Sequence, residues 1–201
     1  MNKLIAISIL SLLSTGAFAQ NRDETSLNYN NVSVGYVSQT ITSSDDSSVN
    51  YTFTGYGFDG SYLLTDHIFA IGSYASSSNS TDFDQSVTFT STQLGLGYRY
   101  PLSKETDLNG TVTYLSNTFT SDSTGTGYVA TVGISSVALS PDLETSIRYN
   151  SMSITQDGVK ETSTGYGLGA KYSFTKNVYA GLSYLTVTNA SRYILSIGYK
   201  F

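Results

Sequence analysis

An all-β fold, a transmembrane up-and-down antiparallel β-barrel, is what this 201-residue sequence predicts. Three observations lead to it. Only 12% of the residues are charged, about half the share of an ordinary soluble domain. The chain contains 17 tyrosines and 18 glycines, and four segments repeat one Gly-rich hairpin pattern. Within these segments apolar residues alternate with small or polar ones, as in strands whose two faces meet different surroundings.

The composition also excludes several classes of protein. The chain has no cysteine, so it cannot form a disulfide scaffold or a cysteine-ligated zinc or iron–sulfur site. Disordered chains are rich in charge and poor in aromatic residues, which is the reverse of this composition. A mean hydropathy of −0.09, without a long apolar run after residue 19, argues against a bundle of transmembrane helices.

The first residues carry the three parts of an export signal in order. Asn2 and Lys3 form a short positive start, Leu4 to Leu13 supply an apolar stretch of ten residues, and Ala17-Phe18-Ala19 is a small-x-small cleavage site. The apolar stretch is too short to cross a bilayer as a helix. We therefore expect residues 1–19 to be a signal peptide and residues 20–201 to form one exported barrel domain.

Ten strands are expected in this domain. They are placed at 26–41, 49–64, 68–77, 87–102, 106–118, 126–139, 143–155, 162–174, 178–188 and 191–201. Short turns near Asp66, Lys104, Pro141 and Lys176 alternate with more polar links, including 157–161, and an even strand number puts both ends on the periplasmic side. Apolar residues change from odd to even numbers after Tyr29, so a bulge is expected near Asn30. Eight strands are the alternative.

The charged residues predict which face of the strands meets lipid. Eight of them fall within strands, all opposite the apolar face: Asp59, Arg99, Asp107, Glu144, Arg148, Lys171, Arg192 and Lys200. An Arg or Lys facing lipid near mid-membrane costs about 2–4 kcal/mol, so this face is interpreted as the lumen. A soluble sandwich or lipocalin-like barrel would instead carry many more charges on its outside. We interpret Asp59, Arg99, Glu144, Arg148, Lys171 and Arg192 as a charge network that plugs the lumen, and a narrow water-filled channel is the rival interpretation.

Two hairpins and the C-terminal strand carry a resemblance to a known family. They are Gly57 to Tyr62 with Leu64-Thr65-Asp66, Gly167 to Tyr172 with Phe174-Thr175-Lys176-Asn177, and the ending Tyr193-x-Leu195-x-Ile197-x-Tyr199-x-Phe201. Over residues 26–201 the chain resembles the small single-domain bacterial outer-membrane β-barrel proteins, which include OmpX, the OmpA transmembrane domain and compact Xanthomonas-type members. The resemblance implies an outer-membrane location, contact with its lipids, and recognition of the C-terminal strand by the barrel-assembly machinery. It does not imply one task, because the group contains adhesins, resistance factors, narrow pores and enzymes.

No catalytic residue, metal site or cofactor is expected. The single histidine, His67, is predicted to lie in a periplasmic turn, far from the outer leaflet where barrel hydrolases act. Acidic residues dominate the outer links, at Asp45, Asp46, Asp82, Asp84, Asp122, Asp157 and Glu161. They disfavour nucleic acid as a partner and would give a pore a cation-favouring mouth.

The expected function is therefore that of an integral outer-membrane barrel, favoured as a monomer, with a structural or surface-interaction role in the envelope. A small passive channel is the first alternative, and an outer-membrane hydrolase is the second.

Overall fold

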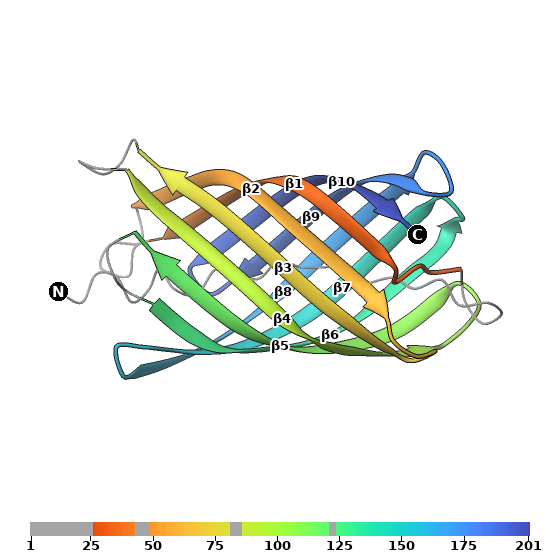
Figure 1. The fold of residues 1–201 in the computed structure, drawn as a ribbon, viewed down its shortest axis with the longest axis horizontal. Coiled ribbons are helices and arrows are strands. Elements are labelled where there is room, and N and C mark those ends of the chain that lie inside the picture. The colour runs from red at the N-terminus through yellow and green to blue at the C-terminus, as the bar shows by residue number, and fades with distance from the viewer. Residues whose placement is uncertain (1–25, 43–48, 81–85, 121–123) are drawn as a thin grey trace.

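A computed structural model of the chain describes residues 26–42, 49–80, 86–120 and 124–201. It contains ten strands: β1 (Asn31–Thr42), β2 (Asn50–Leu63), β3 (Ile68–Asn79), β4 (Val87–Pro101), β5 (Thr106–Phe119), β6 (Thr124–Ser140), β7 (Leu143–Gln156), β8 (Val159–Ser173), β9 (Val178–Val187) and β10 (Ala190–Lys200). Each strand pairs antiparallel with its neighbours in sequence, and β1 pairs with β10 to close the barrel (Figure 1). The predicted all-β, ten-stranded barrel is confirmed, and the alternative of eight strands is wrong. Among the described residues there is no helix with the length and apolarity to span a membrane.

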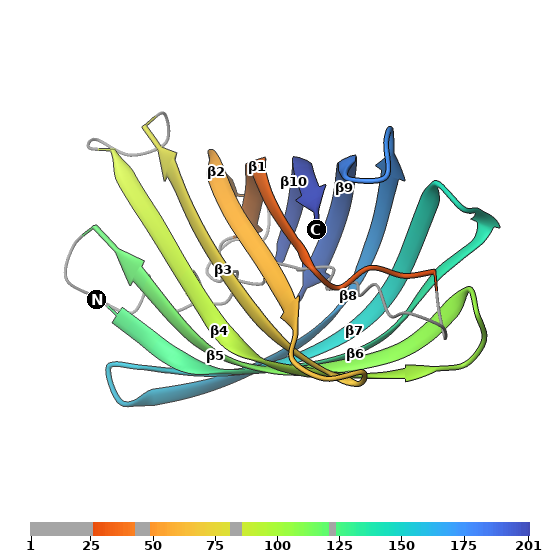
Figure 2. The same cartoon turned by 45° about the vertical axis from the view of Figure 1, so that its right-hand side comes forward.

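The two ends of the barrel are built differently. At one, the turn end, short links connect β2 to β3, β4 to β5, β6 to β7 and β8 to β9, and β10 ends there with the C-terminus. Threonine hydroxyls close two of these turns: Thr65 Oγ1 accepts from the Ile68 amide at 3.0 Å, and Thr175 Oγ1 accepts from the Val178 amide at 3.0 Å. The opposite end, the loop end, carries the other five links. The strands run obliquely between the two ends around a curved wall (Figure 2).

Two predicted boundaries are wrong. β1 begins at Asn31, and its registers with β2 and β10 run without a break, so there is no bulge near Asn30. Leu27 and Tyr29 are instead buried, because the segment before β1 folds against the inside of the barrel. At the loop end β8 begins at Val159, because Asp157 and Gly158 form a two-residue turn with φ of 51° and 78°. That Asp-Gly turn suits a tight hairpin and replaces the predicted link over 157–161.

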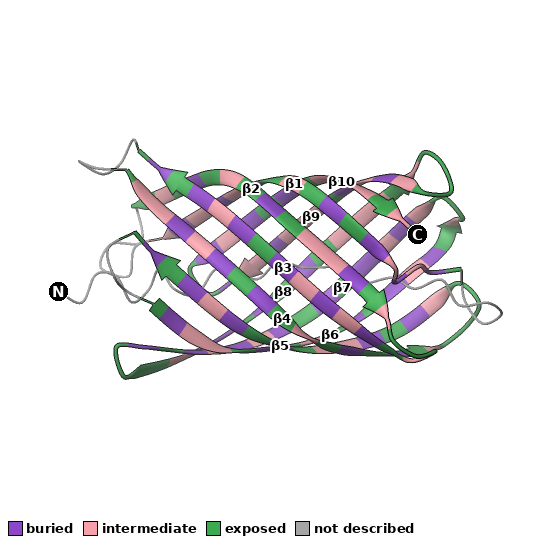
Figure 3. Ribbon diagram, viewed as in Figure 1, coloured by how far each residue is buried: buried purple, intermediate pink, exposed green. Residues whose placement is uncertain are grey.

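Buried and exposed residues alternate along each strand, which gives the wall its inner and outer faces (Figure 3). The structure places the eight strand charges named above on the lumen side. The outer face of the middle of the barrel carries large apolar residues such as Leu96, Val112, Ile147 and Leu195, all more than half exposed. The candidate functional residues of the barrel therefore lie either in the lumen or on the outer face.

Candidate functional site

Four charged side chains meet inside the barrel near the turn end. Asp59, Glu144, Arg148 and Lys171 line a common cavity of about 30 Å³, which is room for about one or two water molecules. Ser33 Oγ donates to Asp59 Oδ1 at 2.7 Å, and Arg148 Nη2 donates to Ser146 Oγ at 2.9 Å. Lys200 adjoins this group, since its Nζ lies over the same Tyr179 ring as that of Lys171. Two acids and three bases therefore form a charged layer in the lumen.

A second charged group is separate from this layer. Arg99 and Asp107 are both fully buried, with 3.2 Å between Arg99 Nε and Asp107 Oδ2. Tyr29, which precedes β1, donates its hydroxyl to the same carboxylate at 3.0 Å and lies with its ring 5.3 Å from the Arg99 guanidinium. Burial and the nearby Asp107 carboxylate raise the pKa of the Tyr29 phenol well above its usual range, so it acts as a hydrogen-bond donor.

The segment that carries Tyr29 closes the turn end from inside. Leu27 and Tyr29 pack with Phe69, Ile71 and Val137 in a buried apolar cluster, and the Tyr29 and Phe69 ring centroids are 4.8 Å apart. The segment is fixed at both ends: the Ser26 amide donates to the Lys104 carbonyl at 2.8 Å, and the Phe201 amide donates to the Asn30 carbonyl at 3.0 Å. Residues 26–30 thus act as an internal cover rather than as strand.

Arg192 lies apart from the other charges, toward the loop end. Its Nε and Nη2 atoms donate to Gln39 Oε1 at 3.2 Å and 2.5 Å, and Gln39 Nε2 donates to Ser77 Oγ at 3.0 Å. Arg192 is 1% exposed, and among the described residues its Nη1 has no hydrogen-bond partner. An amide, rather than a carboxylate, holds this arginine.

The lumen beyond Arg192 is mainly apolar, although Asn79, Asn117, Gln156 and Ser163 are also buried at this end. Eleven buried residues from eight strands pack together there: Ile41, Phe53, Phe89, Leu115, Phe119, Val129, Met152, Ile154, Leu185, Val187 and Ala190. We call this set the loop-end core. Phe89 and Phe119 lie with their ring centroids 4.8 Å apart. The lumen is therefore filled in three layers, with apolar residues at both ends and polar and charged residues between them.

A ring of tyrosines encircles the outer face at the level where the lumen becomes apolar. We call it the tyrosine girdle; nine strands contribute one residue each, and β4 has Leu94 at this level: Tyr36, Tyr56, Tyr74, Tyr114, Tyr128, Tyr149, Tyr166, Tyr184 and Tyr193. Neighbouring rings contact one another, for example Tyr149 with Tyr166 at 5.4 Å and Tyr184 with Tyr193 at 4.6 Å between centroids. Aromatic side chains are typical of the two membrane–water interfaces of a transmembrane barrel.

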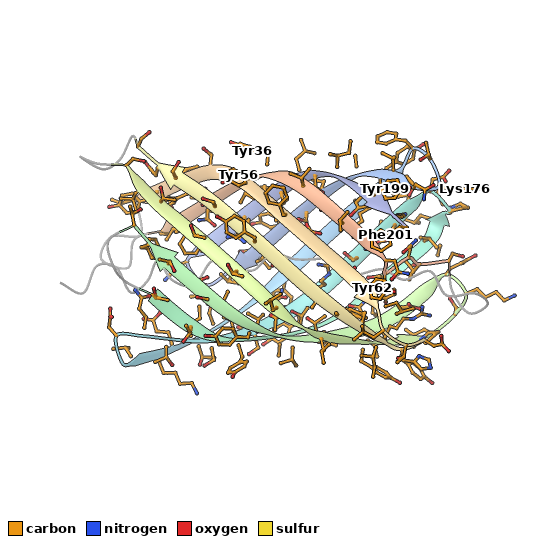
Figure 4. The ribbon with its side chains drawn as sticks, viewed as in Figure 1. Tyr36, Tyr56, Tyr62, Lys176, Tyr199 and Phe201 are labelled. Carbon is orange, nitrogen blue, oxygen red and sulfur yellow. The ribbon has the colours of Figure 1, made fainter. Side chains whose placement is uncertain are left out.

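A second aromatic group marks the turn end. Tyr62, Tyr199 and Phe201 lie together there, while Tyr36 and Tyr56 lie toward the other end of the barrel (Figure 4). The Tyr62 and Phe201 rings stack with centroids 6.4 Å apart. From Tyr166 on β8 to Phe174, which directly follows the strand, the eight-residue step corresponds to roughly 20 Å along the barrel axis at about 3.3 Å per residue and a tilt near 40°. This is near the apolar height of about 25 Å that such barrels show.

The outer face changes abruptly beyond the tyrosine girdle. Every outward strand position between the girdle and the loop end is Ser or Thr, apart from Asn50 and Lys160. We call this set the hydroxyl collar: Ser38, Thr40, Thr42, Asn50, Thr52, Thr54, Ser76, Ser78, Thr88, Thr90, Thr92, Ser116, Thr118, Thr124, Thr126, Ser151, Ser153, Thr155, Lys160, Thr162, Thr164, Thr186 and Ser191. All ten strands contribute. Some hydroxyls meet across strands, as Thr118 and Thr124 do at 3.5 Å.

Glycines mark the transition between these two parts of the wall. Inward-facing glycines next to girdle positions include Gly55 on β2, Gly95 on β4, Gly127 on β6 and Gly165 on β8. At Gly127 a Cβ atom would overlap the backbone carbonyl of Ser153 on β7. Only glycine permits this close approach of neighbouring strands.

The structure brings together four of the six residues predicted to form a lumen charge network. Asp59, Glu144, Arg148 and Lys171 share one cavity, while Arg99 pairs with Asp107 and Arg192 pairs with Gln39. The C-terminal residues Tyr193, Leu195, Ile197, Tyr199 and Phe201 are all about half exposed on the outer face. The loop-end core and the hydroxyl collar were missed, although the alternation of apolar and hydroxyl residues beyond each tyrosine is visible in the sequence.

The remaining residues considered in the sequence are His67, possible metal ligands and the acidic residues of the outer links. His67 lies in the turn between β2 and β3, 5.7 Å from the Tyr98 ring, and its backbone carbonyl accepts from the Arg99 amide at 2.8 Å. Within the described ranges no group of three or more His, Cys, Asp or Glu residues could hold a metal ion. Asp45, Asp46, Asp82, Asp84, Asp122 and the predicted signal peptide lie outside the described residues. Asp157 lies in the β7–β8 turn, and Glu161 lies within β8 near its first residue.

Comparison with known proteins identifies the family. The family model of the outer membrane protein beta-barrel domain matches residues 6–201, and the chain belongs to this family. It is accordingly an outer-membrane protein, and since the ends of such barrels are periplasmic, its turn end faces the periplasm and its loop end faces outward. A search of the curated proteins gave no match.

Solved structures with this fold come from several bacteria. An outer membrane channel from Pseudomonas putida F1 is 12% identical, with a TM-score of 0.55 over 90% of this chain and 99% of that chain. The beta domain of the Bordetella autotransporter BrkA is 12% identical, with a TM-score of 0.52 over 86% of this chain and 99% of that one. The attachment invasion locus protein Ail of Yersinia pestis is 16% identical, with a TM-score of 0.45 over 86% of this chain and 97% of that one. The likeness to the Pseudomonas channel and to the Bordetella beta domain is one of fold.

Proposed function

We propose that this outer-membrane barrel is closed to ions and serves as a structural and surface-interaction component of the envelope. The observation that carries the proposal is the three-layer filling of the lumen. A permeating ion would have to cross the loop-end core, whose packed apolar side chains cannot replace its water shell. It would then meet the charged layer and the cover formed by residues 26–30. Export through residues 1–19 is part of the same proposal.

Conductance of the purified chain in planar bilayers tests closure. We expect no stepwise currents over many insertions, with insertion verified by the different gel mobility of boiled and unboiled samples. A variant that carries Phe89→Ala and Phe119→Ala, which removes two adjacent rings of the loop-end core, is the matched control for detection of a partly opened lumen. Reproducible steps from the unaltered chain, selective for cations, would instead establish the small passive channel.

A catalytic role is not part of the proposal. Hydrolysis at the outer leaflet needs a general base there, and His67, the single histidine of the chain, lies at the opposite, periplasmic end. A His67→Ala variant should leave the envelope lipids and surface proteins unchanged, as judged by mass spectrometry of whole envelopes. A change in the acyl chains of the lipids or in surface proteolysis would contradict the non-catalytic proposal.

The outer face of β10 supports a role in assembly. Its alternating residues Tyr193, Leu195, Ile197 and Tyr199 and the final Phe201 present one apolar stripe outward, and we propose that the barrel-assembly machinery recognises it. Phe201→Ser should lower the amount of folded barrel in cells several-fold while the purified variant still folds in detergent. Tyr62→Ser removes the partner of the Phe201 ring and is the control for a purely structural loss.

A further inference from the structure

We propose that the hydroxyl collar is a contact surface for the neutral sugars of the glycolipid headgroups that surround the barrel in the outer leaflet. The inference rests on the surface-interaction part of the proposed function and holds whether or not the lumen conducts. It follows from the position, the shape and the charge of the collar.

The collar lies just outside the hydrocarbon. Tyrosine rings prefer the membrane–water interface, so the tyrosine girdle fixes the outer boundary of the apolar layer. From Tyr36 the collar continues to Thr42 on β1, a step of six residues, or roughly 15 Å of height at the strand rise and tilt of such barrels. The loop-end core lies at the same height inside the barrel, so this part of the wall keeps its apolar side inward, as a water-exposed barrel does.

The shape of the collar selects the kind of partner. All ten strands contribute to it, so it presents the same chemistry in every direction around the barrel. A protein partner would need a patch on one side, with apolar anchors and a polar rim. A partner that encircles the barrel at the height of the headgroups is the lipid leaflet itself.

The charge of the collar selects the part of the headgroup. Lys160 is its single ionisable side chain, so the collar has no cluster of Arg and Lys with which to pair phosphates. Hydroxyl groups both donate and accept hydrogen bonds, and exposed hydroxyls occur in neighbouring pairs, as at Thr118 and Thr124. Such a surface matches the donor and acceptor groups of uncharged sugars.

The test measures which lipids remain bound to the purified full-length barrel. The protein is reconstituted in phosphatidylcholine vesicles that contain either diglucosyl diacylglycerol or lipid A, extracted, and analysed for retained lipid by native mass spectrometry. We expect several-fold enrichment of the neutral diglucosyl lipid over phosphatidylcholine. Enrichment of lipid A alone would assign the contact to phosphate, and equal retention of all lipids would show only a hydrated surface; either result would overturn the proposal.

Paired variants connect the effect to the collar hydroxyls. The first carries Thr→Val at Thr118, Thr124, Thr155, Thr162 and Thr164, all exposed, and the second carries Thr→Ser at the same positions. The valine variant should lose the enrichment and the serine variant should keep it. The control variant carries Thr106→Val and Ser136→Ala, which remove an outward hydroxyl pair, 2.8 Å apart, at the turn end of β5 and β6. It should leave the lipid enrichment unchanged. Equal loss in the valine and serine variants would contradict the hydroxyl contact. The bilayer conductance of the unaltered chain decides closure separately.

Discussion

The barrel wall has opposite faces in its two parts. Between the aromatic groups its outside is apolar, as at Leu96 and Val112, and its inside holds Asp59, Glu144, Arg148 and Lys171. Beyond the tyrosine girdle the same strands present hydroxyls outward and the loop-end core inward. The outer face of one continuous sheet thus meets lipid in one part and water in the other. The same strands run through both parts, so the surroundings of the outer face determine which face carries the apolar residues.

The largest expected effect comes from the loop-end core. Phe89→Ala should lower the free energy of unfolding by about 3–5 kcal/mol, because a cavity remains in a packed interior. Leu94→Ala on the same strand faces lipid and should cost less than half as much, since lipid chains fill the space. Urea unfolding in vesicles, followed by circular dichroism, measures both. Equal losses would show that the two parts do not differ in packing.

The second comparison uses two buried arginines. Arg99→Met removes the cation beside Asp107 and should cost about 3–5 kcal/mol of unfolding free energy, because the carboxylate stays buried. Arg192→Met removes an arginine held by Gln39, and loss of that hydrogen bond is offset by removal of a buried charge, so a change within about 1 kcal/mol is expected.

The double variant Arg99→Met with Asp107→Asn is the control for this comparison. It should recover much of the stability that Arg99→Met loses, because no buried carboxylate remains. A large loss for Arg192→Met would mean that the outer part of the lumen depends on charge as the inner part does.

Much of this comparison could be predicted from the sequence, and part of it could not. Lipid-facing strands such as Leu94 to Leu102 show a period of two with charges on one side, so the fold and the lumen side of Arg99 and Lys171 followed from parity. The partner of Arg192 did not follow, because Gln39 reaches it through the pairing of β1 with β10, which lie far apart in the chain. The partner of Arg99 did not follow either: Asp107 lies on the neighbouring strand β5, and parity assigns a side chain to a face without showing which side chain it contacts. The burial of Tyr29 did not follow either: the change from odd to even apolar positions after it predicted a bulge near Asn30, whereas the segment before β1 turns into the lumen.

The loop-end core was missed for a different reason. Phe89, Leu115 and Ile154 alternate with Thr or Ser as regularly as the lipid-facing residues alternate with Gly, but on the opposite face of the strand. The alternation of apolar and polar residues along a strand does not show which of the two faces points into the lumen. The exchange of the two faces becomes visible when the tyrosine girdle is taken as the boundary between the two parts of the wall.

A charge placed on the outer face measures where that boundary lies. Val112→Arg should lower the free energy of unfolding in vesicles by about 1–3 kcal/mol, because Val112 lies on the lipid face inside the tyrosine girdle and the cost of an arginine there rises with depth. Thr118→Arg lies on the same strand and the same face, within the hydroxyl collar, and should cost no more than about 1 kcal/mol. The two variants unfold in the same vesicles, so the difference reports depth alone. A cost at Thr118 equal to that at Val112 would place the collar inside the hydrocarbon.

The glycines between the two parts give the smallest of these effects. Gly127→Ala would bring a methyl group against the backbone of β7 and should cost about 1–3 kcal/mol of unfolding free energy through backbone displacement. Gly110→Ala on β5 meets its nearest atom, the Thr131 carbonyl oxygen, at 3.5 Å and should be neutral or stabilising by up to about 1 kcal/mol. The unfolding free energies of both variants in urea show whether glycine is required at the girdle or is merely tolerated along the strands. Equal stabilities would mean that neighbouring strands approach no more closely at the girdle than elsewhere. Glycine would then have no special structural role where the two parts of the wall meet.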